Sequence, residues 1–137
     1  MKALALALLL FAADTETPFD PLDSKEMQAV QGSWDAYQQG KHVWTITLEG
    51  DRYHAVFTEE EYWYKGRFRM RSEHSPGQID FLIDECNCSH TETSSKGIFR
   101  WAGETLVLVA PHVLSPRPDS FVGVNESELY QLTRVQE

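Results

Sequence analysis

Hydrophobic and polar residues alternate along most of the chain from residue 33 onward, which is typical of half-buried β-strands. Residues 42–57 give the clearest case, because apolar residues occupy every second position on either side of a turn at Gly50 and Asp51. This spacing predicts a hairpin whose apolar face carries Trp44, Ile46, Leu48, Tyr53, Ala55 and Phe57.

The same alternation continues to the end of the chain. In "YWYKGRFRMR" (62–71) one face carries Tyr62, Tyr64, Phe68 and Met70, and "IDFLID" (79–84) presents Ile79, Phe81 and Ile83. A second hairpin follows around Ala102 and Gly103, and "SELYQLTRV" (127–135) is the last strand. About eight strands joined by short turns predict an all-β antiparallel barrel or sandwich. Gly66 inside a strand predicts a bulge or a sharp bend there.

A helical segment precedes the strands. In "DSKEMQAVQG" (23–32), Asp23 is placed to cap a short helix, Glu26 follows three residues later, and Gly32 is placed to end it. The acidic stretch before it contains two prolines. We expect residues 14–23 to be an exposed linker and residues 24–137 to form the barrel domain.

The junction between helix and strands contains the motif Gly-x-Trp, made by Gly32 and Trp34. A short helix followed by this motif can lay the indole across one end of a barrel, where the glycine permits close backbone approach. A basic side chain of the last strand can then stack on the ring. The residues predicted to close the barrel are therefore Gly32, Trp34 and Arg134.

Five sequence motifs, taken in their order along the chain, resemble those of an uncharacterised lipocalin-like domain family, known mainly from planctomycete-type bacteria. The motifs are "VQGSW" (30–34), "QID" (78–80), "GIFRWAGETLVL" (97–108), "PRPDSF" (116–121) and "LTRV" (132–135). The chain departs from the family pattern at Phe99 and at 102–104. The resemblance implies a lipocalin-like β-barrel and frequent export, and it supplies no catalytic residue.

The N-terminus differs in composition from the rest. Residues 1–13 carry one lysine, a short apolar run and small residues at the end, which resembles a secretory signal peptide. The alternative is a buried N-terminal helix of a cytosolic protein. The run is too short to cross a bilayer as a helix. We therefore expect a secreted or periplasmic protein with no membrane span. The formal net charge of −9 argues against nucleic-acid binding, which needs a basic surface.

The barrel interior is the first candidate site. Eight-stranded barrels either hold one small ligand or are filled by their own side chains. The first hypothesis is a binding module for a small apolar or amphipathic molecule, and the second is a packed barrel that acts as a structural or protein-interaction module. The residues expected to meet a ligand are Trp44, Ile46, Tyr53, Phe57, Tyr64, Phe68 and Phe81.

The loop "DECNCSH" is the second candidate. Cys86, Cys88 and His90 recur at every second position, so on an extended strand they would share one face and could ligate Zn²⁺ or Cu⁺. The alternative is an exposed polar loop. A disulfide between residues only two apart on a strand would have poor bridging geometry, so these cysteines are not expected to staple the fold, and their redox state stays open. No fourth ligand is specified, so no cofactor is predicted.

A basic stripe on the strand at 62–71 is the third candidate. It faces either the barrel lumen, where it would meet an anion, or solvent, where it would pair with neighbouring acids. Because the opposite face is apolar, the outer position is expected for Lys65, Arg67, Arg69 and Arg71. No spacing of Ser, His and Asp predicts a catalytic group, so the chain is expected to be non-enzymatic.

Overall fold

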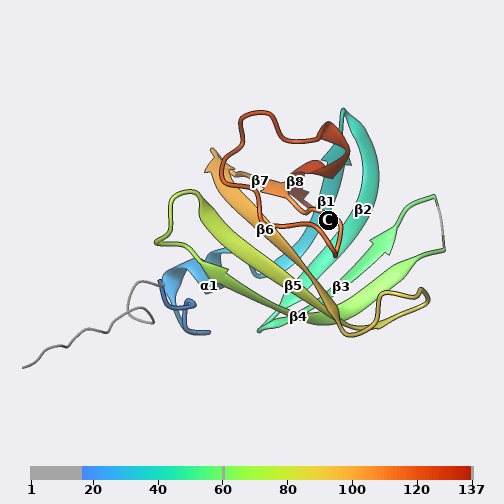
Figure 1. The fold of residues 1–137 in the computed structure, drawn as a ribbon, viewed down its shortest axis with the longest axis horizontal. Helices are drawn as coiled ribbons and strands as arrows, with labels where there is room; N and C mark the ends of the chain where they lie inside the picture. The colour runs from blue at the N-terminus through green and yellow to red at the C-terminus, as the bar shows by residue number, and fades with distance from the viewer. Residues whose placement is uncertain (1–16, 60, 137) are drawn as a thin grey trace, which may run out of the picture.

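The computed structural model describes residues 17–59 and 61–136, and it is a closed antiparallel barrel of eight strands that begins with one short helix (Figure 1). The predicted fold class is confirmed. The elements are α1 (Lys25–Ala29), β1 (Gly32–Gln38), β2 (Lys41–Glu49), β3 (Arg52–Phe57), β4 (Trp63–Arg71), β5 (Gly77–Cys86), β6 (Thr93–Ala102), β7 (Thr105–Val109), the 3₁₀ turn η3 (Glu126–Glu128) and β8 (Leu129–Arg134).

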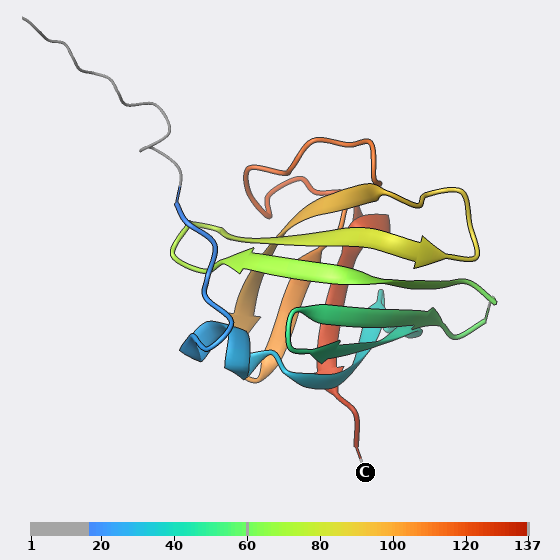
Figure 2. The same ribbon diagram turned by 90° about the horizontal axis from the view of Figure 1, so that it is seen from below.

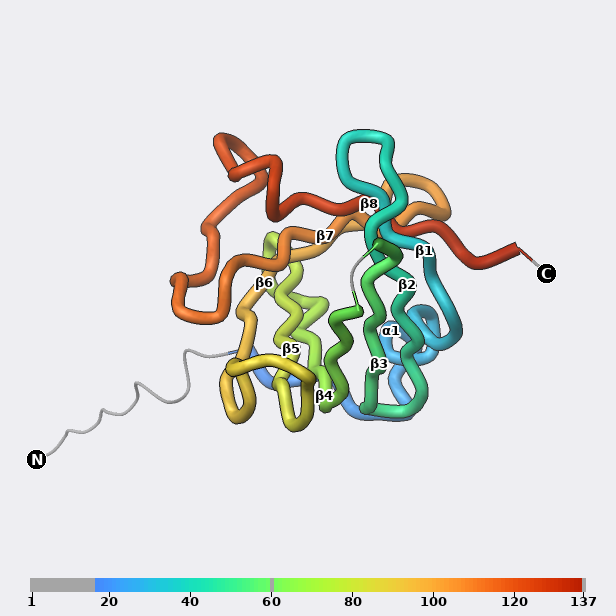
Figure 3. Tube along the Cα trace, turned by 90° about the vertical axis from the view of Figure 1, so that its right-hand side faces the viewer, coloured from blue at the N-terminus to red at the C-terminus, as the bar shows by residue number. Residues whose placement is uncertain are grey.

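Each strand pairs with the next along the chain, and β8 pairs with β1 to close the sheet. Trp34 of β1 lies opposite Arg134 of β8 in this register. Figure 3 shows the two strands side by side. Closure removes the exposed sheet edges that otherwise recruit other chains.

The up-and-down path gives the barrel two different ends. Helix α1 lies at one end together with the β2–β3, β4–β5 and β6–β7 turns, and we call this the closed end (Figure 2). The connections β1–β2, β3–β4, β5–β6 and β7–β8 lie at the other end, which we call the loop end. The β7–β8 connection is the longest of them and runs from residue 110 to η3.

Inward and outward residues alternate as the pattern predicts. On β4, Gly66, Phe68 and Met70 are buried, and the intervening Arg67 and Arg69 are exposed. Tyr62 precedes the strand and is 44% exposed, so it does not share the buried face as expected. Burial of a side chain such as Phe68 contributes roughly 2 kcal/mol to folding, so the inward face supplies the main stabilisation.

The bulge predicted at Gly66 is present. The pairing of β4 with β5 shifts register between Lys65 and Gly66. A Cβ atom at Gly66 would lie 1.8 Å from the carbonyl oxygen of Leu82, so no larger residue fits without moving the backbone. The glycine is therefore required by the close approach of two strands.

The basic stripe lies on the outer face, where it pairs with acids of β5. Arg67 donates two hydrogen bonds to Asp84, each 3.0 Å long. These bonds hold the pKa of Asp84 below its usual range and raise that of Arg67. The stripe is thus a solvated outer face that forms ion pairs with the neighbouring strand, and its side chains do not point into the lumen.

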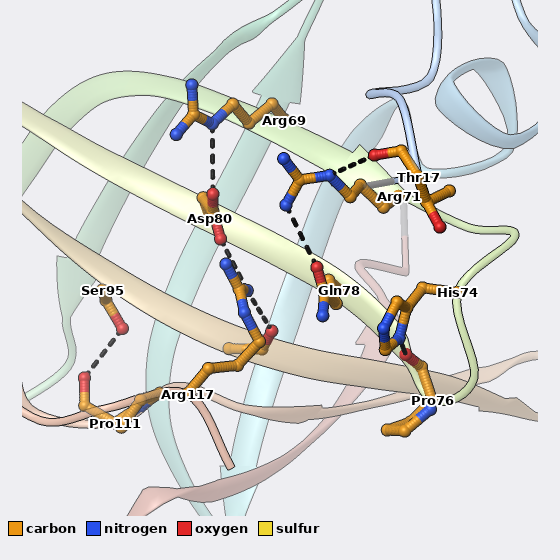
Figure 4. Close-up of polar contacts among 11 residues, drawn as sticks. Thr17, Arg69, Arg71, His74, Pro76, Gln78, Asp80, Ser95, Pro111 and Arg117 are labelled. Atoms are coloured by element: carbon orange, nitrogen blue, oxygen red, sulfur yellow. Dashed lines mark hydrogen bonds and ion pairs between the residues drawn. The ribbon is translucent and has the colours of Figure 1, made fainter. Parts of the chain in front are cut away.

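Asp80 differs from the other outer-face acids because it is 2% exposed. Arg69 Nε donates to its Oδ2 at 3.1 Å, and Arg117 Nη1 from the β7–β8 connection lies 2.7 Å from its Oδ1 (Figure 4). Arg117 also donates to the carbonyl of Gly97 at 2.9 Å. One carboxylate therefore fastens the long connection across β5 and β6.

Part of the segment before the helix, which was expected to be an exposed linker, contacts β4, while residues 21–23 are exposed. Arg71 donates to the carbonyl of Thr17 at 2.6 Å, and the guanidinium groups of Arg69 and Arg71 lie 4.1 and 3.8 Å from the centre of the Phe19 ring (Figure 4 shows the Thr17 bond). The backbone N–H of Ser72 donates to the Asp20 carboxylate. The predicted signal peptide (1–13) and residues 14–16 lie outside the described residues.

Ser24, and not Asp23, caps the helix, because its hydroxyl accepts the backbone N–H of Met27 at 3.2 Å. The helix ends at Ala29, so Gly32 begins β1 and does not end the helix. Within residues 17–59 and 61–136, no helix has the length and apolar character needed to cross a membrane.

Candidate functional site: the barrel interior

The structure brings together the three residues that were expected to close the barrel. The guanidinium of Arg134 lies 4.2 Å from the centre of the Trp34 ring, and it donates to the carbonyls of Gln31 and Ala29, each at 2.7 Å. The indole is fully buried and donates to the carbonyl of Val30 at 2.9 Å. Gly32 has φ of +117°, and a Cβ there would lie 3.0 Å from the guanidinium. These contacts seal the closed end.

Above this floor the barrel is hollow. A partly open cavity of about 170 Å³ occupies the half of the interior nearer the loop end. Its walls are mostly aromatic and aliphatic, and its lining includes Ala36, Trp44, Ile46, Tyr53, Ala55, Tyr64, Phe81, Ile83, Leu108, Tyr130 and Leu132. A cavity of this size and lining accommodates a molecule comparable to benzene.

The cavity exists because small residues occupy inward positions in its walls. On β1 the inward residue Trp34 fills the floor, and the next inward residue is Ala36. On β3 the corresponding small residue is Ala55. Both alanines are buried and both line the cavity. The side chains at these two positions therefore leave the space that a leucine or phenylalanine would fill.

Five of the seven residues expected to meet a ligand line the cavity, and these are Trp44, Ile46, Tyr53, Tyr64 and Phe81. Phe57 does not line it, because its ring packs against Trp44 with centroids 3.9 Å apart. Phe68 does not line it either, because it is buried in the packed core, with its centroid 6.4 Å from that of Phe81. Position along the strand separates these two from the others.

Two tyrosines bring hydroxyl groups into this apolar space. Burial raises the pKa of Tyr53 far above its ordinary value, with the negative charge of Asp84 adding to the effect. Burial also raises the pKa of Tyr130, although hydrogen bonds with the side chains of Trp44 and Gln38 oppose the shift. Both phenols therefore stay neutral at physiological pH and act as hydrogen-bonding groups.

Histidines from two loops stand at the mouth of the cavity. His90 belongs to the β5–β6 loop and His112 to the β7–β8 connection, and their rings meet edge to face with centroids 5.5 Å apart. Both line the cavity. Ser95 and Pro111 lie beside them, where the serine hydroxyl donates to the proline carbonyl at 2.7 Å (Figure 4).

Sequence reasoning missed several of these lining residues. The alternation on the last strand gives Tyr130 and Leu132 the same face, and this signal was sufficient to place both inside. No periodic signal marks Ser95 or His112 as cavity residues, since their place depends on how the long connection folds back.

Cys86 and Cys88 form a disulfide, although poor bridging geometry was expected of them. Strand β5 ends at Cys86 and the chain bends over residues 87–89, which brings the two Cα atoms to 5.2 Å, within the range that a disulfide spans. Poor bridging geometry applies to an extended segment, and the chain bends directly after Cys86. The bond closes a ring of three residues and joins no distant elements.

The disulfide also removes the basis of the proposed metal site. A bonded cysteine has no thiolate to offer, and the backbone N–H of His90 donates to Cys88 Sγ at 3.4 Å. Among the described residues, no group of three or more His, Cys, Asp or Glu side chains is arranged to hold a metal ion. The imidazole of His90 turns to the cavity and to His112 instead.

Comparison of the chain with family models, curated proteins and solved structures finds no match.

Proposed function

We propose that this chain is a non-enzymatic lipocalin-like binding module that takes a compact apolar or amphipathic molecule into its barrel. The observation that carries the proposal is the cavity of about 170 Å³ at the loop end. Its mostly apolar lining would bury the surface of a small apolar ligand, and burial of that kind drives binding. The volume suits a single ring or a short chain and is small for larger lipids.

The cavity also supports this proposal over a packed barrel that acts only through its surface. Trp34, Phe68 and Met70 are buried side by side with the rest of the core in the closed half. The other half keeps a cavity although Tyr64 and Trp44 stand beside it and are only partly buried. Selective filling of one half is what a barrel with a binding site needs.

Export to the periplasm or the cell exterior is part of the same proposal. The signal-like residues 1–13 are its sequence basis. The bond between Cys86 and Cys88 adds support, because disulfides persist in oxidising compartments and are rare in the cytosol. The motifs shared with the lipocalin-like domain family are consistent with both the barrel and the export.

Native mass spectrometry of the purified protein tests the function. We expect adduct mass in the range of a small organic molecule, which is lost when the protein is denatured. An Ala55→Leu variant fills the cavity and should abolish the adduct. Ala102→Leu makes the same chemical change at the exposed last residue of β6 and should retain it. Adducts that are equal in the two variants would contradict binding inside the barrel.

A further inference from the structure

We propose that the two histidines at the mouth select the ligand, which is a compact aromatic molecule with one hydrogen-bond-accepting head group. This inference rests on the proposed function and adds the chemical class of the ligand. The body would occupy the apolar part of the cavity, and the head would lie at the mouth beside the rings of His90 and His112.

Hydrogen bonds fix the backbone at both histidines before any ligand arrives. The backbone N–H of His112 donates to the Glu128 carboxylate at 3.2 Å, and that of Ala110 donates to the carbonyl of Glu128 at 2.9 Å. The hydroxyl of Thr93 donates to the carbonyl of His90. Pre-positioned groups lose less conformational entropy on binding, so they contribute more to affinity.

The hydrogen bonds of His112 decide which proton it offers. The backbone N–H of Leu114 donates to Nδ1 of His112 at 3.4 Å, so in the neutral ring Nδ1 is the acceptor and Nε2 carries the proton. Nε2–H is therefore a donor at the mouth. The ring nitrogens of His90 make no hydrogen bond to any residue of the described chain, so they are available to a ligand.

Two other polar groups of the lining are already engaged. The Ser95 hydroxyl donates to Pro111, and the Tyr130 hydroxyl makes hydrogen bonds with Trp44 and Gln38. Tyr53 is only 6% exposed and belongs to the buried core. The histidines are thus the polar groups that the two loops present to a ligand at the opening, and the rest of the lining is mostly apolar apart from Ser95 and the tyrosine hydroxyls.

Calorimetric titration with toluene and with p-cresol tests the inference, because the two probes differ only in the hydroxyl head. We expect both to bind the wild-type protein at one site, with p-cresol about fivefold tighter, the fold-change that one net hydrogen bond supplies. In the His90→Leu/His112→Leu double variant, the preference for p-cresol should vanish and toluene should bind as before. His74→Leu, in the β4–β5 turn at the closed end, is the matched control and should retain the preference.

Equal affinity of the wild-type protein for the two probes would overturn the inference and leave the proposed function standing. A preference that survives in the double variant would also overturn it, since a tyrosine would then hold the head group. Failure of both probes to bind would overturn the proposed function together with this inference. Urea unfolding of each variant shows that loss of binding is not loss of fold.

Discussion

The buried carboxylate of Asp80 gives the sharpest test of how the barrel is held together, through the substitution Asp80→Ala. The side chain is 3% exposed and takes one ion pair from β4 and one from the long connection. The change removes the only shared partner of Arg69 and Arg117 among these contacts. It also frees the connection that shapes the cavity mouth.

The exposure of the two arginines determines how much Asp80→Ala should destabilise the protein. Removal of one partner of a buried ion pair costs roughly 3–5 kcal/mol. The Arg69 side chain is 45% exposed and regains water, whereas that of Arg117 is 18% exposed and, among the described residues, keeps its hydrogen bond to Gly97. We therefore expect the free energy of unfolding to fall by about 3 kcal/mol, the low end of this range. With a denaturant slope of about 2 kcal/mol per molar, the urea midpoint falls by about 1.5 M.

Equilibrium urea unfolding followed by tryptophan fluorescence measures this shift. Asp84→Ala is the matched control, because it removes an acid from the same strand that pairs with an arginine of β4 on the solvated face. The midpoint of this control should move by a small fraction of the Asp80→Ala shift. Equal shifts in the two variants would refute the claim that burial, and not pairing alone, makes Asp80 important.

Three further changes test other parts of the account. Arg134→Lys should lower the free energy of unfolding by about 2 kcal/mol, because lysine cannot both stack on the indole and make the two carbonyl bonds; an unchanged urea midpoint would count against the sealed floor. The raised pKa values of Tyr53 and Tyr130 mean that stability is fully present below the ordinary tyrosine pKa of about 10 and is lost as the pH rises above it. Tyrosinate absorbance should show these phenols ionising only as the protein unfolds, and their titration in the folded protein at the ordinary pH would disprove their burial. The Cys86→Ser/Cys88→Ser variant should lose only about 1.5 kcal/mol in urea unfolding, because the closed ring is short; a loss of several kcal/mol would show that the bond organises more than its own loop.

Strand positions and inward faces are predictable from the sequence because period-two alternation is a local property. Phe68 and Arg69 are adjacent, and their chemistry alone tells which side each one faces. Gly66 predicts the bulge because glycine is otherwise rare in the interior of a strand. Trp34 predicts the closed end of the barrel because its indole follows a short helix and has a basic residue of the last strand as a partner.

The cavity and the buried acid are not local properties. Asp80 occupies a polar position of an alternating strand and would be solvent-exposed if Arg117 did not fold over it from 37 residues later in the chain. Ala36 and Ala55 create space only because they line the same half of the interior. The bend after Cys86 and the position of His112 at the mouth depend on loops, whose conformation no periodic pattern of residues predicts.

A crystal structure of the protein crystallised with toluene tests most directly the central claim, which is that the barrel binds a small apolar molecule in its interior. The account predicts one ring bound inside the loop-end half of the barrel, in contact with Trp44 and Ala55, with the floor at Trp34 unchanged. A barrel whose own aromatic side chains fill that space and leave no toluene inside would contradict it.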